Sequence, residues 1–347
     1  MNKTEKVLHL FPSSSFSGAE NVACQIIKLF ENEIEMVYCC PTGPIIKNLE
    51  ERNVKHIPLE KFNYSSLKKV IDEFKPTIIH THDIRAGILA SLFSNRCKII
   101  SHIHGNHEDM RKTNLKTILY LLASPKFKHI FWVSNSCLSN YKFSSKIKHK
   151  SSILYNIINP DDVIKKADTD ENTYDFDIIY LGRFSYAKNP KRLIDILSLL
   201  KEKKPCIKCA LVGTGELYDE TLNYSSEKGL ENNVKFLGFQ SNPYKILKSS
   251  KVSLMTSVFE GTPMSALEAM ALGVPIVSTP TDGLKDVITN DFNGFLSDDN
   301  EEFVNHVINI LENEELQKKL SQNALKFSRE YNDLSKYKDA IRFEYEK

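Results

Sequence analysis

Short runs of apolar residues alternate along this chain with stretches of helical periodicity. In the first half, runs that predict strands lie at 7–11, 36–40, 77–82, 98–104, 129–134 and 152–156. In the second half they lie at 177–182, 209–213, 234–238, 251–257 and 275–279. Strands that alternate with helices are typical of βαβ units and parallel sheets. The pattern therefore predicts an α/β fold with two halves.

An acidic, apolar-poor segment, DTDENTYDFD at 168–177, marks the joint between these halves. We predict two Rossmann-like domains with parallel sheets facing a central cleft, where ligands would bind beyond the carboxyl ends of the strands. The predicted boundaries are a first domain at 1–160, a linker at 161–176, a second domain at 177–330, and a charged C-terminal helix at 331–347 that crosses back to the first domain.

Composition narrows the class of protein. The 347 residues are 26% charged and 41% hydrophobic, which is typical of a soluble globular protein, and the net charge of +2 argues against nucleic-acid binding. No apolar run approaches the ~20 residues that span a bilayer, and the N-terminus lacks the pattern of a signal peptide. The odd number of cysteines, seven, fits a reducing compartment. We expect a cytoplasmic protein.

The charge is unevenly distributed. Residues 111–160 contain nine Lys or Arg and no Asp or Glu, which leaves 37 basic and 44 acidic residues elsewhere. One interpretation is a solvated basic face. The other is peripheral contact with an anionic membrane, on the inner face of the plasma membrane, through cations around the apolar ILYLL patch: Arg111, Lys112, Lys116, Lys126 and Lys128.

The segment FEGTPMSALEAMALGVPIVST, at 259–279, carries two carboxylates in an otherwise uncharged setting. Thr262 is a good N-cap and Pro263 suits the first helical position, so we expect a helix to begin there and to end at Gly273. Glu268 lies inside this apolar helix, where an unpaired carboxylate is costly. Glu260 lies just ahead of the helix N-terminus. Either Glu268 is a structural carboxylate that caps a neighbouring turn, or both glutamates bind a ligand.

A second block, LGRFSYAKNPKRL at 181–193, is basic. Arg183 ends a predicted strand, and Lys188 precedes a helix that Asn189 caps. Two cations beside a helix N-terminus suit a diphosphate. The alternative is a solvated basic helix start.

Histidines cluster at the ends of two predicted strands: His80, His82, His102, His104 and His107. Alternation along a strand places His102 and His104 on the same face. No H-E-x-x-H or D-x-D pattern indicates a bound metal.

The spacing E-(seven residues)-E followed by AMALGVPIV resembles the retaining glycosyltransferases of family 4, which have the GT-B fold. The resemblance implies that Glu260 contacts the hydroxyls of the transferred sugar and that Glu268 binds the ribose of the nucleotide. The blocks LVGTGEL, VKFLGF and SGAE follow the order of the same family. The donor-binding residues that the resemblance implies are Gly18, Gly182, Gly215, Phe239, Gly261, Thr262, Pro263, Met264, Ser265 and Glu268.

The resemblance also implies a catalytic set of His104, Arg183, Lys188 and Glu260. In it, His104 lies near the anomeric carbon, a place that His102 could also take, and the two cations stabilise the leaving diphosphate. The implied function is retaining transfer from a nucleotide-sugar donor, a UDP-sugar by preference, to a glycan or lipid-linked acceptor in cell-surface polysaccharide biosynthesis. We expect no metal and no cofactor. The alternatives are a nucleotide-sugar epimerase of the same fold, and a catalytically idle subunit that binds a nucleotide sugar.

Overall fold

The computed structural model describes residues 5–105, 108–261 and 263–347. The chain forms two compact units, residues 1–156 with 334–347, and residues 157–333. Each unit is an α/β layer structure in which every strand pair of the described residues is parallel. The predicted pair of parallel-sheet α/β domains is confirmed.

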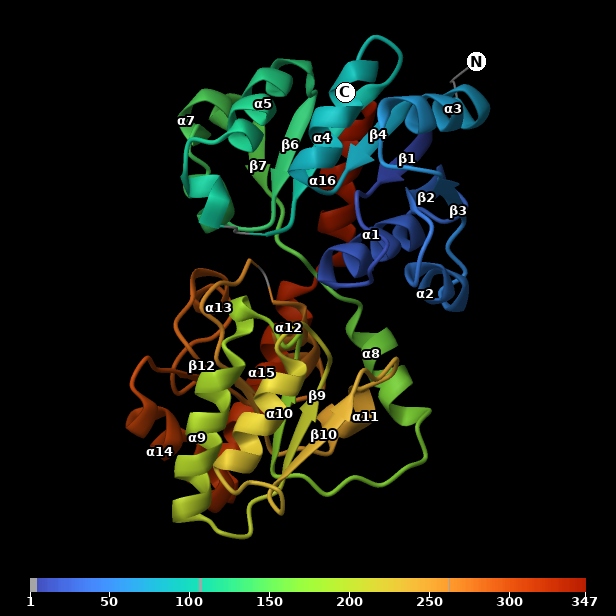
Figure 1. The fold of residues 1–347 in the computed structure, drawn as a ribbon. Helices are drawn as coiled ribbons and strands as arrows, with labels where there is room; N and C mark the ends of the chain where they lie inside the picture. Colours follow the sequence, from blue (N-terminus) through green and yellow to red (C-terminus); the bar gives the residue numbers. More distant parts are fainter. Residues whose placement is uncertain (1–4, 106–107, 262) are drawn as a thin grey trace. The chain divides into compact units, whose positions relative to one another are not determined.

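The first unit contains a seven-stranded sheet in the order β3-β2-β1-β4-β5-β6-β7 (Figure 1). Its strands are β1 (Lys6–Leu10), β2 (Glu35–Pro41), β3 (His56–Leu59), β4 (Ile78–Thr81), β5 (Lys98–Ile103), β6 (His129–Trp132) and β7 (Ser151–Ile153). Its helices are α1 (Gly18–Leu29), α2 (Ile45–Glu51), α3 (Tyr64–Phe74), α4 (Ile84–Ala90), α5 (Leu115–Ala123), α6 (Asn135–Ser139), α7 (Ser144–Ile147) and α16 (Leu334–Glu346).

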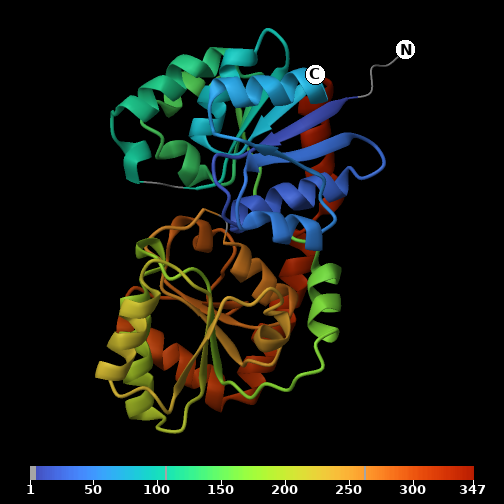
Figure 2. The same cartoon turned by 45° about the vertical axis from the view of Figure 1, so that its right-hand side comes forward.

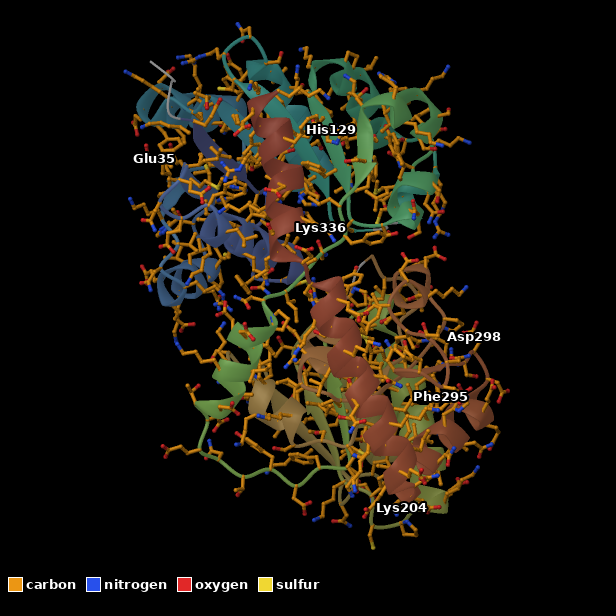
Figure 3. All side chains as sticks on the ribbon, turned by 180° about the vertical axis from the view of Figure 1, so that it is seen from behind. Glu35, His129, Lys204, Phe295, Asp298 and Lys336 are labelled. Carbon is orange, nitrogen blue, oxygen red and sulfur yellow. The ribbon has the colours of Figure 1, made fainter. Side chains whose placement is uncertain are left out.

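The last helix, α16, belongs to the first unit although it is the end of the chain. Tyr345 is fully buried, and its hydroxyl lies 2.6 Å from Nδ1 of His80 on β4. The Nζ of Lys98 donates to the backbone oxygen of Tyr345 at 2.7 Å. Figure 3 shows this helix from behind, lying along the sheet beside His129, which is 3.5 Å from the carboxylate of Glu344.

The second unit contains a six-stranded sheet in the order β10-β9-β8-β11-β12-β13. Its strands are β8 (Ile178–Leu181), β9 (Cys209–Val212), β10 (Val234–Gly238), β11 (Val252–Met255), β12 (Ile276–Ser278) and β13 (Gly294–Leu296). Its helices are α8 (Pro160–Asp168), α9 (Pro190–Lys203), α10 (Tyr218–Glu227), α11 (Tyr244–Lys248), α12 (Met264–Ala271), α13 (Asp282–Lys285), α14 (Asn300–Glu312) and α15 (Glu314–Tyr331). Figure 2 shows α9 and α10, in yellow-green and yellow, on one side of this sheet, and the orange α12 on the other.

The sequence predicted most strands of both sheets because their central strands are continuous apolar runs. Two edge strands, β3 and β13, were not predicted. The first contains Pro58, which lacks a backbone donor and is tolerated only at an edge, and the second has three residues.

The predicted linker at 161–176 is wrong over its first half, because α8 occupies residues 160–168. The side chain of Asn159 caps this helix by accepting from Asp161 N at 3.1 Å, and Pro160 takes the first helical position. Val163 is buried in a core of the second unit, and Ala167 is fully buried. Within the described residues, every helix is too short or too polar to cross a membrane.

Candidate functional site

The loops after β8 and β11 bring together two charged side chains that the motifs single out. The Nζ of Lys188 donates to Oε1 of Glu260, and this oxygen also accepts from Oγ of Ser257 at 2.6 Å. The backbone ties the two loops, since Val258 N donates to Ala187 O at 2.8 Å. Because β8 and β11 are parallel neighbours where the strand order reverses, their carboxyl-end loops form the default ligand site of such a sheet.

The Lys188–Glu260 pair is largely withdrawn from water. The two side chains are 21% and 9% exposed. Removing one member of such a pair leaves the other charge buried without a partner, which strongly destabilises the fold. A ligand that separates the pair must therefore offer each charge a new partner. The ammonium of Lys188 needs an anion, and the carboxylate of Glu260 needs hydrogen-bond donors such as hydroxyl groups.

The backbone that carries Lys188 is fixed by the start of α9. Asn189 adopts a left-handed conformation, with φ of 50°, and its side chain accepts from Arg192 N at 3.4 Å. The predicted cap at Asn189 is confirmed. Thr256 Oγ1 from the end of β11 donates to the backbone oxygen of Lys188 at 3.0 Å.

Arg183 has a different partner. Its guanidinium lies 3.0 Å from the carboxylate of Glu216, and both side chains are more than half exposed. An exposed pair of this kind contributes about 0–1 kcal/mol, so a diphosphate can compete with Glu216 for the guanidinium. Arg183 and Lys188 therefore each have an ion-pair partner of their own, Glu216 and Glu260.

Two glycines allow the loops after β8 and β9 to touch. A Cβ on Gly215 would lie 2.2 Å from Phe184 O, and one on Gly213 would lie 1.9 Å from Gly182 O. Phe184 N donates to Thr214 O at 3.0 Å. A side chain at Gly213 or Gly215 would push apart the loops that hold Arg183 and Glu216.

Glu268 is buried in α12, as its apolar surroundings predicted. Its Oε1 accepts from Oη of Tyr244, on α11, at 3.1 Å. The ring of Tyr244 also lies under Nζ of Lys166, 5.9 Å from the ring centre. A hydroxyl donor from a neighbouring helix thus offsets part of the cost of burying this carboxylate.

The start of α12 differs from the prediction. The helix begins at Met264, and Pro263 is the N-cap because its ψ of 111° is not helical. The predicted cap, Thr262, lies outside the described residues. The helix ends at Ala271, two residues before its predicted end, and Gly273 has a left-handed φ of 69° after the C-cap residue Leu272. Ahead of the helix, Gly261 packs so tightly that a Cβ on Gly283 would lie 1.4 Å from its oxygen.

The remaining predicted donor residues lie at element ends. Phe239 follows β10 with 58% of its surface exposed, and Met264 and Ser265 in the first turn of α12 are half-buried. Gly18 is the exposed first residue of α1, in the first unit.

Histidines line the carboxyl ends of β4 and β5 in the first unit. His102 and His104 lie on the same face, as alternation predicted, with ring centres 4.1 Å apart. His102 is fully buried, whereas His104 is partly exposed and lies 2.8 Å from His82 through Nε2 and Nδ1. Accessibility favours His104 over His102 as a ligand-binding residue. His107 lies outside the described residues.

Comparison with models of protein families shows the family to which the chain belongs. Residues 16–162 match the model of Glycosyltransferase Family 4, and residues 162–327 match that of Glycosyl transferases group 1. The two models together span most of the chain. The chain is a family 4-type glycosyltransferase.

Curated relatives of this glycosyltransferase are similar over most of their length. It is 26% identical to the UDP-Gal:alpha-D-GlcNAc-diphosphoundecaprenol alpha-1,3-galactosyltransferase of Escherichia coli, over 90% of this chain and 89% of that one. It is 27% identical to the capsular polysaccharide biosynthesis glycosyltransferase CapH of Staphylococcus aureus, over 76% and 78%.

The fold of the glycosyltransferase matches solved structures. Anabaena HepE in complex with UDP-glucose superposes with a TM-score of 0.82 at 20% identity, covering 97% of this chain and 98% of that one. Staphylococcus aureus TarM superposes with a TM-score of 0.79 at 14% identity, covering 100% and 99%. These likenesses establish the GT-B architecture of two parallel-sheet domains.

Sequence reasoning missed three partners in this glycosyltransferase: Ser257, Glu216 and Tyr244. Ser257 lies next to the motif, three residues before Glu260. Glu216 is part of the recognised GTGEL block, so its charge was the available signal. Tyr244 lies in a short helix 24 residues before Glu268, and the sequence around it gave no indication of the contact.

Proposed function

We propose that this glycosyltransferase moves a sugar from a UDP-sugar to a glycan or lipid-linked acceptor of cell-surface polysaccharide biosynthesis, with retention of configuration. The observation that carries the proposal is the Lys188–Glu260 pair at the switch point of the second sheet, with Glu268 buried in the helix behind it. The names of the E. coli and S. aureus relatives, and the UDP-glucose in HepE, support the donor and the acceptor class.

The proposed chemistry uses charges that the chain already holds. The sugar hydroxyls hydrogen-bond to Glu260, which frees Lys188 to face the diphosphate. Arg183 exchanges its exposed partner Glu216 for the same diphosphate. Cations fixed beside a departing anion stabilise the transition state more than the ground state. The acceptor hydroxyl then attacks from the face that the nucleotide leaves, and a phosphate oxygen takes its proton.

The nucleotide is proposed to bind deeper in the same unit. Glu268 accepts hydrogen bonds from the ribose hydroxyls, and Tyr244 holds the carboxylate in place. The first turn of α12, from Pro263 to Ser265, and the loops at Gly182, Gly215 and Gly261 lie against the diphosphate and sugar. The exposed ring of Phe239 is available to the base. We propose that the reaction needs no divalent metal.

A transfer assay tests this function against its alternatives. The protein is mixed with radiolabelled UDP-hexoses and GDP-hexoses, with and without a polyprenyl-diphosphate-linked sugar. We expect label to move from a UDP-hexose into the lipid fraction. Conversion of the donor to its epimer without an acceptor would favour an epimerase, and binding without either reaction would favour an idle subunit.

We further propose that the first unit contacts an anionic membrane through α5. Leu115, Ile118, Leu119 and Leu122 are all exposed, with Leu115 at 72% and Leu122 at 67%. At 100° per residue these four positions fall within one third of the helix circumference, so they form a single apolar stripe. Tyr120 on the opposite face is buried.

Cations surround this stripe. Lys112 precedes the helix, Lys126 and Lys128 follow it and are exposed, and Lys116 lies on the helix itself, 3.4 Å from Asp109. An apolar stripe flanked by lysines is typical of helices that lie in a membrane interface. Each cation near an anionic surface contributes about 1 kcal/mol. A solvated basic face alone would not require the exposed leucines.

Vesicle co-sedimentation tests the contact. Wild type should bind phosphatidylglycerol vesicles at low salt more strongly than phosphatidylcholine vesicles, and salt of a few hundred millimolar should weaken the binding. Leu122→Glu should abolish it, whereas Leu92→Glu, at a residue 52% exposed elsewhere in the same unit, should not. Equal binding to both lipids, or binding that Leu122→Glu leaves intact, would refute the proposal.

A further inference from the structure

A row of side-chain contacts crosses the first sheet from Met36 on β2 to the end of β5. The Nε2 of His9 lies 3.4 Å from Sδ of Met36, and the Nδ1 of His9 lies 2.9 Å from Nε2 of His82. The Nδ1 of His82 lies 2.8 Å from Nε2 of His104. The strands β2, β1, β4 and β5 are neighbours in this order (Figure 1), so the row follows the sheet from strand to strand.

The methionine end of the row requires a proton on His9 that points toward the sulfur. A thioether has no hydrogen to donate and accepts only weakly, so the Nε2 of His9 is the donor of this contact. A neutral imidazole has one N–H and one lone pair, so the Nδ1 of His9 accepts from Nε2–H of His82. The Nδ1 of His82 is therefore left with a lone pair, and this lone pair faces His104.

The other end of the row requires a proton that points the opposite way. Burial lowers the pKa of His104 to about 3, and a hydrogen bond with the side chain of Asn156 acts in the raising direction. An effect of that sign means that the amide oxygen accepts a proton from the ring. Because Nε2 of His104 faces His82, this proton belongs on Nδ1, and the Nε2 keeps the lone pair. Two lone pairs thus meet at 2.8 Å, which is stable only with a cation between them.

A third imidazole distinguishes a metal ion from a shared proton. His102 is fully buried, and among the described residues neither of its ring nitrogens has a hydrogen-bond partner. Its ring centre lies 4.1 Å from that of His104 and 5.7 Å from that of His82. One ring nitrogen from each of the three histidines lies within 4.8 Å of the others. A proton joins two of these nitrogens, whereas a metal ion joins all three.

We propose that Nδ1 of His82, Nε2 of His104 and a ring nitrogen of His102 bind one divalent transition-metal ion of the zinc type. Imidazole nitrogen suits zinc, copper and nickel, whereas magnesium and calcium prefer oxygen. His104 is partly exposed, so water has access to a fourth coordination position.

The row supplies the outer partners that metal-binding histidines usually have. A ligating imidazole commonly donates its second N–H to a carbonyl oxygen or another acceptor, which fixes its orientation. Asn156 takes this role for His104, and His9 takes it for His82. Zinc–nitrogen bonds of about 2.0–2.1 Å in a tetrahedron place the nitrogens about 3.3 Å apart, so the rings of His82 and His104 must separate by about 0.5 Å.

The proposed ion lies outside the sugar-transfer reaction, for which we propose no divalent metal. Its effect is on the stability of the first unit, because an ion that binds the folded state alone raises the free energy of unfolding. The tests of the site therefore need no sugar donor and no acceptor. Their outcome is independent of the proposed function.

Cobalt titration of the wild-type site tests the proposal, because Co²⁺ reports its ligands through visible absorption. The protein is prepared without a polyhistidine tag, stripped with EDTA, and carries Cys206→Ser because Cys206 is an exposed thiol. We expect one equivalent of Co²⁺ to bind at micromolar concentration with the bands of nitrogen ligation, and zinc to displace it. Absence of binding in this range, or absorption typical of thiolate ligation, would overturn the proposal.

Matched variants locate the ion. His102→Phe keeps a buried ring without a ligand atom and should weaken cobalt binding by more than about 100-fold, beyond the usual loss for an outer partner. His149→Phe, at an exposed histidine, should bind as the wild type does. Asn156→Leu should weaken binding by about 10–100-fold. Equal affinities of His102→Phe and wild type would overturn the site, and an unchanged affinity of Asn156→Leu would overturn the role of Asn156.

Thermal unfolding of the wild type gives a test that needs no variant to fold. Trp132 is buried in the first unit and reports its unfolding by fluorescence. Zinc at 100 times its dissociation constant should raise the transition temperature of the first unit by about 5–10 °C, and excess EDTA should reverse the rise. X-ray absorption of the zinc-loaded protein should show three imidazole ligands. An unchanged transition temperature, or fewer than three imidazoles, would contradict the proposal.

Discussion

Acidification should unfold the first unit of this glycosyltransferase before the second. His9, His80, His82 and His102 are buried in the first unit, and His104 beside them is partly exposed with its Nδ1 buried. Burial is the largest cause of the lowered pKa of each. In the unfolded chain the same rings titrate at about 6.5. Between pH 6.5 and the folded pKa, the unfolded chain binds more protons, so the free energy of unfolding falls as the pH falls.

The size of the effect follows from this difference. With a folded pKa of about 3, His9 and His104 each lower the free energy of unfolding by about 2 kcal/mol at pH 5, relative to pH 8. These two groups amount to about 4 kcal/mol, and the lowered pKa values of His80, His82 and His102 act in the same direction. A domain is typically stable by about 5–15 kcal/mol, so we expect the first unit to lose its fold near pH 5.

The chain offers a local probe for this transition. Its only tryptophan, Trp132, is fully buried on β6 in the first unit. The second unit contains one histidine, His306. Trp132 fluorescence should therefore change near pH 5, while part of the far-UV circular dichroism persists to lower pH. Native Trp132 emission down to pH 4 would refute the reasoning.

A pair of variants separates histidine titration from other effects of acid. His102→Phe removes one buried titratable ring, and should move the transition to lower pH. His149→Phe removes an exposed ring and should leave the transition where it is. Equal midpoints in the two variants would mean that carboxylates cause the unfolding.

Three further predictions concern the donor site. Arg183→Ala and Lys188→Ala should each lower kcat by about 10²–10³, the usual loss for one such donor, and Arg183→Ala should keep near-normal thermal stability. A near-normal rate in either variant would remove the substituted residue from the mechanism. Glu268→Gln should weaken UDP binding, measured by calorimetry, whereas Glu260→Gln should leave UDP affinity nearly intact and impair transfer; the reverse pattern would exchange the two roles. Transfer should persist in excess EDTA because Arg183 and Lys188 compensate the diphosphate charge, and a loss that magnesium or manganese restores would contradict this.

The fold was predictable where the chain repeats one physical pattern. Continuous apolar runs mark buried parallel strands, and Asn189 before Pro190 marks a helix start, so both features follow from local chemistry. Edge strands β3 and β13 have only four and three residues, which is too short to show that pattern. Helix α8 carried a usable signal, Asn159 before Pro160, that the acidic character of the following residues obscured.

The site was predictable in its residue types but not in its pairings. Lys188 and Glu260 are 72 positions apart, and only the adjacency of β8 and β11 brings them together. The bond from Tyr244 to Glu268 depends on how α11 packs against α12. The neighbourhood of His9 and His80 depends on strand register, which pairs them across β1 and β4. Such contacts between distant segments are set by the tertiary structure.

The anomeric configuration of the product tests the central claim most directly. The protein is incubated with an α-linked UDP-hexose and a lipid-linked acceptor, and the product is purified and its anomeric proton coupling measured by NMR. Retaining transfer predicts a new α-glycosidic bond, formed by the wild type and greatly reduced in Lys188→Ala. A β-glycosidic bond, or no transfer from any UDP-hexose, would contradict the account.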